Sequence, residues 1–378
     1  MKRVSNPDLT VGPGNKPRWN QPAHRRQGFH NAHLIFRRTA TFRAKRVLQL
    51  GRATDSELVQ HPAVLELGKR PEFSGLCLMR YNEILVHEQA ADFPGHQPHS
   101  IQSISKLFAH LIAGRLIASG QLNPEDPVEH YLPEIGTGYR GARVADVLDM
   151  NVANDFSEDY HDPHADSYAE EAALGWRLSA EGTPEPRLHD FICAITSDGV
   201  ANASPKIRYS SANTDLMTLI FERLAPGCAL SFLEELVEEA GFEHALHMSL
   251  SVEGIPALCG GGCLSLSDLG RFGLMLNCVA RDAARPWQAA YLRRTMERAH
   301  KTLPEPRAYV RYAGQMMSDG RWVGHTGYGG QVLMTDPESG TVCAYLSVLE
   351  NEAGYCVDYM ARTMDLMAQL LDMVRSSA

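Results

Sequence analysis

The stretch HSIQSISKLFAHLIAGRLIASGQL, residues 99–122, places a cluster of serines and one lysine directly before a strongly apolar helical pattern. Ser100, Ser103, Ser105 and Lys106 crowd the expected first turn, where the helix dipole is positive. Because residues three apart share a helix face, Lys106 should lie beside Ser103 and beside neither of the other two serines. The stretch therefore predicts a Ser-x-x-Lys pair at a helix N-terminus.

Two interpretations of this pair are open. In the first, Ser100 or Ser103 caps the helix and Lys106 is solvated, which is an ordinary use of serine at a helix start. In the second, Ser103 is a nucleophile whose proton is accepted by the neighbouring lysine. Two later segments favour the second interpretation, because RYSSANTD (208–215) and GHTGYGGQ (324–331) follow in the order and at the separation expected of Ser-x-x-Lys acyl-transfer enzymes.

The two flanks of the chain have the pattern of an antiparallel sheet. Residues 74–88 carry apolar runs on both sides of positions 81–83, which predicts a hairpin. Residues 331–349 predict a second hairpin, since QVLMT and TVCAYLSVL flank the turn DPESG. Apolar residues recur at helical spacing over 357–374, so this helix should pack on the sheet. The chain between the flanks is helix-rich, which predicts an α+β fold: an antiparallel sheet flanked by helices, with an inserted, mostly helical subdomain.

The expected organisation is one large domain, residues 66–378, preceded by an extension, residues 1–65. Within the domain we expect sheet parts at about 66–98 and 305–378 and a helix-rich insert at about 99–304. The first 50 residues hold eleven Lys or Arg and one acid, although the whole chain has a net charge of −9. This basic arm is expected to pack on the acidic body, with a partner or targeting role as the alternative.

Two shorter segments also carry structural predictions. In CGGGCLSLSDLGRFGLML (259–276), a glycine turn should lead through a Ser267 cap into a helix. Residues 155–177 are polar and rich in carboxylates and aromatics, which is typical of a loop.

Composition argues against several classes of protein. A net charge of −9 disfavours a general nucleic-acid binder. No run approaches the roughly 20 apolar residues of a membrane span, and no apolar secretory stretch stands at the N-terminus, so a cytoplasmic location without membrane association is expected. Eight scattered cysteines without a CxxC pair predict free thiols, mostly buried. His161 and His164 lack a third ligand at recognisable spacing, so neither a metal nor a cofactor is expected.

The motifs resemble the serine β-lactamase and penicillin-binding-protein superfamily, and within it the 6-aminohexanoate-dimer hydrolases and related esterases. The likeness runs from about residue 70 to the C-terminus. Its most specific carriers are VLDMNVANDFSEDYHDP (147–163), YSSANTDLMTLIFERL (209–224) and GGGCLSLSDLGRFG (260–273). The resemblance implies a β-lactamase/transpeptidase-like fold.

The same resemblance implies the catalytic roles. Ser103 would be the nucleophile, Lys106 its proton partner and Tyr209 the first residue of the second motif. Tyr209 could carry the proton from Ser103 to the leaving group, and the kinetic base is left open between Lys106 and Tyr209. The backbone NH of Tyr328 would join that of Ser103 as the oxyanion donors.

Five further residues are expected to contact substrate. By the resemblance, Tyr160 lies on a segment that closes over the substrate and contacts the scissile amide. Glu171, with Glu170 beside it, is near the position of a carboxylate that meets a free amine. Gly327 fits a close backbone approach to a ligand. Two positions depart from the commoner motifs. Ser211 stands where Asn is frequent, and His325 stands where Lys is frequent, so recognition of a substrate carboxylate would rest on a side chain that is charged only part of the time.

The resulting hypothesis is a serine hydrolase that cleaves a small-molecule amide or ester through an acyl-enzyme on Ser103, similar to 6-aminohexanoate-dimer hydrolase. A β-lactamase or D-alanyl carboxypeptidase would use the same residues, and so would an acyltransferase that keeps water out. A non-catalytic scaffold is the alternative from another class. A homodimer is left open.

Overall fold

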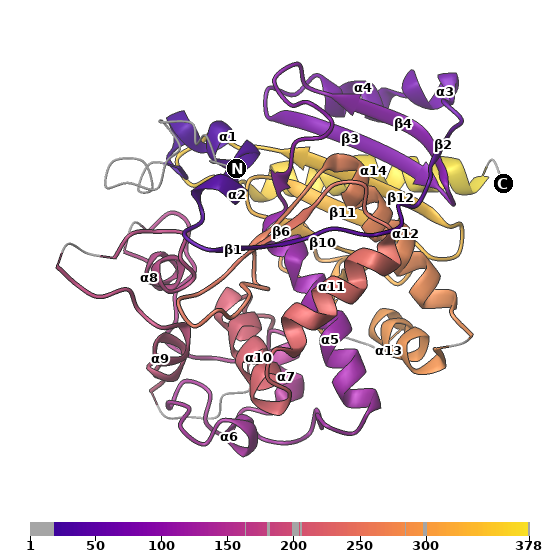
Figure 1. The fold of residues 1–378 in the computed structure, drawn as a ribbon. Helices are drawn as coiled ribbons and strands as arrows, with labels where there is room; N and C mark the ends of the chain where they lie inside the picture. Colours follow the sequence, from indigo (N-terminus) through magenta and orange to yellow (C-terminus); the bar gives the residue numbers. More distant parts are fainter. Residues whose placement is uncertain are drawn as a thin grey trace.

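A sheet of eight strands forms the centre of the molecule (Figure 1). The computed structural model describes residues 19–162, 164–179, 182–198, 204, 206–283, 285–297 and 301–376. All neighbouring strands pair antiparallel except β2 and β4, which are parallel. In spatial order the strands are β2 (Gly51–Arg52), β4 (Glu83–Gln89), β3 (Phe73–Arg80), β12 (Thr341–Ser347), β11 (Gln331–Asp336), β10 (Val323–Gly327), β9 (Met316–Ser318) and β8 (Arg311–Ala313).

Both predicted hairpins are confirmed. β3 and β4 pair around the turn at 81–82, and β11 and β12 pair around the turn at 337–340. Gly340 closes the second turn at φ 72°, a left-handed conformation that glycine adopts without steric cost. The two hairpins then pair with each other through β3 and β12, with Cys77 opposite Ala344. This long-range pairing joins the two flanks of the chain into one sheet.

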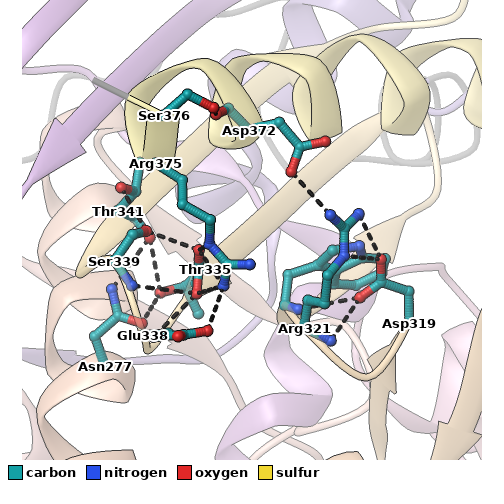
Figure 2. A network of polar contacts seen from close by, with 12 residues as sticks. Asn277, Asp319, Arg321, Thr335, Glu338, Ser339, Thr341, Asp372, Arg375 and Ser376 are labelled. Atoms are coloured by element: carbon teal, nitrogen blue, oxygen red, sulfur yellow. Dashed lines mark hydrogen bonds and ion pairs between the residues drawn. The ribbon is translucent and has the colours of Figure 1, made fainter. Parts of the chain in front are cut away.

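Helices cover both faces of this sheet. α12 (Leu266–Arg281) packs on β3, β11 and β12, whereas α14 (Val357–Ser376) and α4 (Pro62–Gly68) pack on the other face. The predicted C-terminal helix is confirmed as α14, whose apolar stripe is buried. Figure 2 shows the polar network at the end of α14, where Arg375 contacts Asp336 and Glu338 of the β11–β12 turn at 2.8–3.2 Å.

The start of α12 corrects one prediction. The N-cap is Ser265, whose hydroxyl accepts a hydrogen bond from the Asp268 backbone NH at 3.2 Å. Ser267 lies one residue inside the helix, and its hydroxyl contacts His87 at 3.1 Å. Ser265 and Ser267 both stand just before the apolar run of α12, so the local pattern did not indicate which of them is the N-cap.

The predicted helical region lies on one side of the central sheet (Figure 1). α5 (Lys106–Ala118) runs through its middle and is buried along almost its whole length. The surrounding helices are α6 (Val128–Tyr131), α7 (Val144–Leu148), α8 (Asp166–Ala173), α9 (Leu188–Cys193), α10 (Ser211–Leu224), α11 (Cys228–Ala240) and α13 (Pro286–Glu297). α8 falls inside residues 155–177, where the polar composition predicted a loop.

A second, four-stranded sheet lies within this region. Its order is β1 (Thr39–Phe42), β6 (Leu246–Ser249), β7 (Gly262–Leu264) and β5 (His99–Ser100). Because β5 pairs with β7, the glycine turn at 260–262 is held against the start of the Ser-x-x-Lys stretch.

The described part of the N-terminal arm packs on the body. It contains α1 (Pro22–His30), α2 (Ala32–Ile35) and α3 (Ser56–Val59), and the side chain of Phe29 is fully buried. Arg25 is also buried, and its guanidinium donates to the carbonyl oxygens of Leu349 and Asn351 at 2.8 and 2.6 Å. Arg26 pairs with Asp92 at 2.6 Å. The basic residues of the arm are therefore held by backbone carbonyls as well as by acids.

The eight cysteines are all free thiols, and four of them are buried. Across the described ranges, no single helix is long and apolar enough to cross a membrane. The bent pair α10–α11, with a 100° angle between its helices, reaches that length and hydropathy only when both are counted together.

Candidate active site

Ser103 lies in a tight 3₁₀ turn, η1 (Gln102–Ser105), that immediately precedes α5. Neither helix start has a side-chain cap, so the capping interpretation is wrong. Ser100 accepts a hydrogen bond from the Gln102 side chain at 2.7 Å, and Ser105 accepts one from the Gly262 backbone at 3.0 Å. Both of these serines are fully buried, whereas Ser103 lines two cavities. Of the three, Ser103 alone borders these cavities.

The backbone before Ser103 is strained. Gln102 has φ 49°, a left-handed backbone conformation that residues other than glycine adopt rarely. Such strain persists only where the surrounding structure enforces it, and it is commonly found at functional sites. Here it turns the chain from β5 into η1 and presents the Ser103 side chain at the cavities.

Lys106 is the first residue of α5 and is completely buried. Its ammonium donates to the hydroxyl of Ser103 at 3.2 Å, to the hydroxyl of Ser211 at 3.1 Å and to the carbonyl of Cys259 at 2.6 Å. These three contacts use all three N–H groups of an ammonium. The predicted pairing of Ser103 with Lys106 is present, and the solvated lysine of the alternative interpretation is not.

Tyr209 joins the same cluster from the segment before α10. The Lys106 nitrogen lies 5.0 Å from the centre of its ring, a cation–π distance. Burial, together with the negative charge of Glu158, raises the pKa of Tyr209 well above its ordinary value, although a hydrogen bond with Ser103 acts in the opposite direction. Tyr209 is therefore a neutral phenol at rest, with a proton that it can donate.

The end of β10 lies against η1. A methyl group at Gly327 would stand 2.7 Å from the carbonyl oxygen of Ile101 and 3.0 Å from the β-carbon of Gln102, so only glycine fits there. The next residue, Tyr328, lines both cavities together with Ser103. Within the described chain, the backbone NH groups of Ser103 and Tyr328 have no hydrogen-bond partner. The close approach thus brings the end of β10 against the turn that carries Ser103.

His325 is placed differently from the sequence expectation. It is buried and lines neither of the two cavities. Burial, reinforced by Lys106, lowers the pKa of His325 to about 3, so the ring is neutral near pH 7. Its nitrogens contact the carbonyl of Thr326 at 2.6 Å and the hydroxyl of Tyr312 at 3.1 Å. In this geometry His325 offers no charge to a substrate carboxylate.

The two cavities at Ser103 differ in character. The acidic cavity has Glu158, Glu170 and Glu171 among its lining residues. The apolar cavity has these lining residues besides Ser103: Ile207, Tyr209, Leu303, Pro304, Arg307, Met317 and Tyr355, with Tyr160 and the segment 326–328. Tyr160 and Tyr328 line both cavities, with ring centres 4.9 Å apart. Two compartments of different polarity therefore meet at one hydroxyl.

Tyr160 is linked to the site by the carboxylate of Glu158, a residue that the sequence analysis did not name. The Tyr160 hydroxyl donates to Glu158 at 2.6 Å. Ser211 donates to the same carboxylate twice, from its backbone NH at 2.5 Å and from its hydroxyl at 2.9 Å. Because Ser211 also accepts from Lys106, Glu158 connects the aromatic wall of the site to the lysine.

A buried pair of carboxyl groups lies behind the acidic cavity. Glu170 on α8 and Asp215 on α10 are 3% and 0% exposed, and each influences the pKa of the other. Among the described residues, Glu170 Oε1 and both oxygens of Asp215 have no hydrogen-bond partner. A buried carboxyl group without donors favours its protonated form, because desolvation penalises the charge. Burial accordingly raises the pKa of Asp215 to about 7 and that of Glu170 well above its ordinary value.

Glu171 also lines the acidic cavity, as expected from the sequence, but it is already paired. Arg177 contacts its carboxylate at 2.9 and 3.1 Å. Glu158 and Asp215 therefore add acidic groups that the sequence analysis did not assign to the site, whereas Glu170 was expected there beside Glu171. A local signal existed for Asp215, which stands four residues after Ser211 and so shares its helix face.

No group of three or more His, Cys, Asp or Glu side chains in the described part of the chain is arranged to hold a metal ion. The residues that converge on Ser103 are instead hydroxyls, a lysine and carboxyl groups. A hydroxyl with an adjacent lysine, a phenol and two free NH donors is a set suited to acyl transfer.

Comparison with known proteins identifies relatives in sequence and in fold. A curated 6-aminohexanoate-dimer hydrolase of Paenarthrobacter ureafaciens is 30% identical over 204 residues, which is 53% of this chain and 50% of that protein. The match thus spans about half the length of the curated relative. A Bacillus anthracis protein described as a candidate 6-aminohexanoate-dimer hydrolase superposes with a TM-score of 0.81 at 14% identity, covering 98% of both chains. At that identity the likeness concerns the fold.

Other solved structures share the fold more loosely. A penicillin-binding-protein homologue of Caulobacter crescentus superposes with a TM-score of 0.58 at 14% identity, over 84% of this chain and 98% of that one. The predicted β-lactamase/transpeptidase-like α+β fold is confirmed. The β-lactamase family model matches residues 80–362, which is more than half of the sequence, and the chain therefore belongs to the β-lactamase family, with a curated 6-aminohexanoate-dimer hydrolase as a relative over about half of its length.

Proposed function

We propose that this protein is a serine hydrolase that cleaves a linear amide or a carboxylic ester through an acyl-enzyme on Ser103. The observation that carries the proposal is the contact of the Ser103 hydroxyl with buried Lys106 at 3.2 Å, at a cavity where Tyr209 and two free NH groups converge. The substrate class follows from the related 6-aminohexanoate-dimer hydrolase and from the acidic cavity, whose carboxylates suit a substrate with a free amine.

The proposed acylation step balances as follows. In this step Lys106 acts as the free amine, after one ammonium proton has passed to solvent. It takes the Ser103 proton while Oγ bonds to the carbonyl carbon, and the NH groups of Ser103 and Tyr328 bind the oxyanion. Tyr209 then donates its phenolic proton to the leaving nitrogen or oxygen as the bond to carbon breaks. The proton on Lys106 returns to Tyr209. Water resolves the acyl-enzyme by the reverse proton path, and Ser103 regains its hydrogen.

The remaining residues have supporting roles in this proposal. Ser211 and Glu158 hold Lys106 and Tyr160 in place, and Gly327 permits the close approach that forms the oxyanion site. Tyr160, between the two cavities, would contact the scissile group. Glu171 would contribute to binding an amine, although the ion pair with Arg177 partly neutralises its negative charge.

The test is covalent labelling. A fluorophosphonate or a slowly hydrolysed ester should add one phosphonyl or acyl mass to the intact protein, and peptide mapping should place it on Ser103. Ser103→Ala should abolish the label, and the matched variant Ser105→Ala should keep it if folded. A label that persists at an unchanged rate in Ser103→Ala contradicts the proposal, and a label lost only in Ser105→Ala would reassign the nucleophile.

A further inference from the structure

The N-terminal arm supplies part of the wall of the acidic cavity. Trp19 and Asn20 stand among the residues that line this cavity, together with Ser103 and Tyr328. Trp19 is only 4% exposed, so the arm covers it well. Both arm residues precede residue 80, where the match to the β-lactamase family model begins. The arm therefore reaches the site from outside the part of the chain that the family model matches.

Arg25 fixes this part of the arm to the body. Its buried guanidinium donates six hydrogen bonds, all to carbonyl oxygens. Three go to Asn20: one to Oδ1 at 2.9 Å, and two to the backbone oxygen at 2.8 and 3.1 Å. The other three reach backbone oxygens in the loop 349–352 at 2.6–3.2 Å. The same guanidinium lies 5.7 Å from the centre of the Tyr328 ring. One side chain thus ties Asn20 to the body beside Tyr328.

Trp19 is held by aromatic packing. The centre of its ring lies 5.8 Å from that of Phe29 and 6.3 Å from that of Phe36. Phe36 in turn stacks on Trp176 at 5.7 Å, and Trp176 also lines the acidic cavity. A methyl group at Gly28 would stand 2.1 Å from the carbonyl oxygen of Trp19, so α1 lies directly against this residue. Trp19 is therefore part of a packed wall.

This wall faces the acyl half of a substrate. In the proposed function Tyr209 protonates the leaving atom, and Tyr209 lines the apolar cavity and not the acidic one. The leaving half then extends into the apolar cavity, and the acyl half extends into the acidic cavity. Residues that bound the acidic cavity consequently limit the acyl group that can be transferred to Ser103.

We propose that Trp19 and Asn20 set the length of the acyl group that the enzyme accepts, and that Arg25 is the positioning residue that holds them. The inference rests on the proposed function and deepens its substrate class: linear acyl groups up to the length at which the chain meets the arm. A methylene beyond that length must displace packed groups, which a close-packed wall resists. Discrimination by one methylene in an apolar pocket is about 10-fold to 200-fold.

The test uses a series of substrates with one leaving group. The p-nitroanilides of linear ω-amino acids with four, six, eight and ten carbons differ only in the length of the acyl half. The measured quantity is kcat/KM along the series, and the leaving group cancels from the ratio of any two members. The length ratio is kcat/KM for the first acyl group beyond the fall in activity, divided by kcat/KM for the last one before it.

We expect kcat/KM of the wild type to fall at least about tenfold at one step of the series. Trp19→Ala should raise the length ratio at least about tenfold, and Trp19→Phe should raise it less. Arg25→Gln should also raise the ratio, because Asn20 loses its anchor. Arg25→Lys keeps the charge without the fork of donors and should lie between Arg25→Gln and the wild type. Asn20→Ala should behave like Arg25→Gln.

Two controls separate acyl-length selection from a general loss of stability. Arg26→Gln removes the neighbouring arginine of the arm, which pairs with Asp92 and lines neither cavity at Ser103. Trp322→Phe shrinks a buried tryptophan that also lines neither of them. Both variants should keep the wild-type length ratio. A series without a step in the wild type, or an unchanged ratio in the folded Trp19 and Arg25 variants, would overturn the role of the arm.

A measurement without hydrolysis separates this inference from the proposed function. In Ser103→Cys, ω-aminoalkyl methanethiosulfonates of increasing length label the new thiol by disulfide exchange, and peptide mapping gives the labelling rate at position 103. The rate should fall at one step of this series, and Trp19→Ala should remove the step. If no anilide reacts but this step depends on Trp19, the acyl-enzyme proposal fails and the role of the arm stands. If the anilides react and neither series shows a step, the role of the arm fails and the acyl-enzyme proposal stands.

Discussion

Replacing Glu158 with Gln tests the link between the lysine and the aromatic wall of the site. The carboxylate accepts three hydrogen bonds: two from Ser211 and one from Tyr160, at 2.5–2.9 Å. Glu158→Gln preserves the size of the side chain but exchanges one acceptor oxygen for an NH₂ donor. The variant therefore changes hydrogen bonding and charge with little change in packing.

The expected loss of stability follows from how the two carboxylate oxygens of Glu158 are used. The amide oxygen can take the place of Oε1 and keep both hydroxyl donors, which rotate to suit. The NH₂ group then faces the Ser211 backbone NH, so one buried donor loses its acceptor, at a cost of about 1–3 kcal/mol. The two remaining bonds change from charged to neutral acceptors, at about 0.5 kcal/mol each. The total is about 2–4 kcal/mol, most of it expressed in the folded enzyme before substrate binds.

Two measurements check this reasoning. The free energy of unfolding in urea should fall by about 2–4 kcal/mol. The value of kcat/KM for a p-nitrophenyl ester should fall at least about tenfold, because the Ser211 backbone NH loses its acceptor and Ser211 then shifts relative to Lys106. The control Glu235→Gln breaks an exposed ion pair with Arg115 and should change stability by less than about 1 kcal/mol. Wild-type stability and activity in Glu158→Gln would refute the role assigned to this carboxylate.

Three further predictions concern other parts of the site. Tyr209→Phe should reduce amide hydrolysis far more than hydrolysis of a p-nitrophenyl ester, since nitrophenolate leaves without a proton; equal losses on both substrates would contradict its role as the acid. Because burial raises the pKa of Asp215 from 3.8 to about 7, the folded protein keeps a proton that the unfolded chain has released, so stability should fall as pH rises from about 4 to about 7. Asp215→Asn, which does not titrate, should flatten this part of the curve of Tm against pH, and a parallel curve would argue against the raised pKa of Asp215. Gly327→Ala should lower the acylation rate at least about tenfold by pushing β10 away from η1, whereas Gly68→Ala, where a methyl group meets nothing within 4 Å, should leave the rate unchanged; equal rates in both variants would contradict the close approach.

Local sequence patterns were sufficient to predict those features of the fold and site that depend on residues close together in the chain. The hairpins at β3–β4 and β11–β12 follow from alternation and turn chemistry, and α14 follows from its helical spacing of apolar residues. The Ser103–Lys106 contact follows from a separation of three residues, a geometry that an α-helix and a 3₁₀ turn share. Even here the sequence missed a detail, because Ser103 lies in the 3₁₀ turn and α5 begins only at Lys106.

Charge states were decided by tertiary structure. The sequence predicted a partly charged His325 facing substrate, but burial makes the ring neutral and its two nitrogens are used within the fold. The sequence placed Glu170 near a substrate amine, but α8 carries it against Asp215, 45 residues later in the chain, where burial and the neighbouring acid raise its pKa well above the ordinary value. Residue type alone does not determine a pKa, because desolvation and neighbouring charges come from segments that meet only in the fold.

The sequence by itself therefore determined the family, the antiparallel sheet and the chemical type of the site, since spacing along the chain specifies which residues share a turn or a face. Only the tertiary structure decided the division of the site into an acidic and an apolar cavity. Glu158 is 55 residues beyond Ser103, and Arg307 is about 200 residues beyond it, in a turn between the helical region and β8. Their meeting at one hydroxyl depends on long-range packing that no local pattern records.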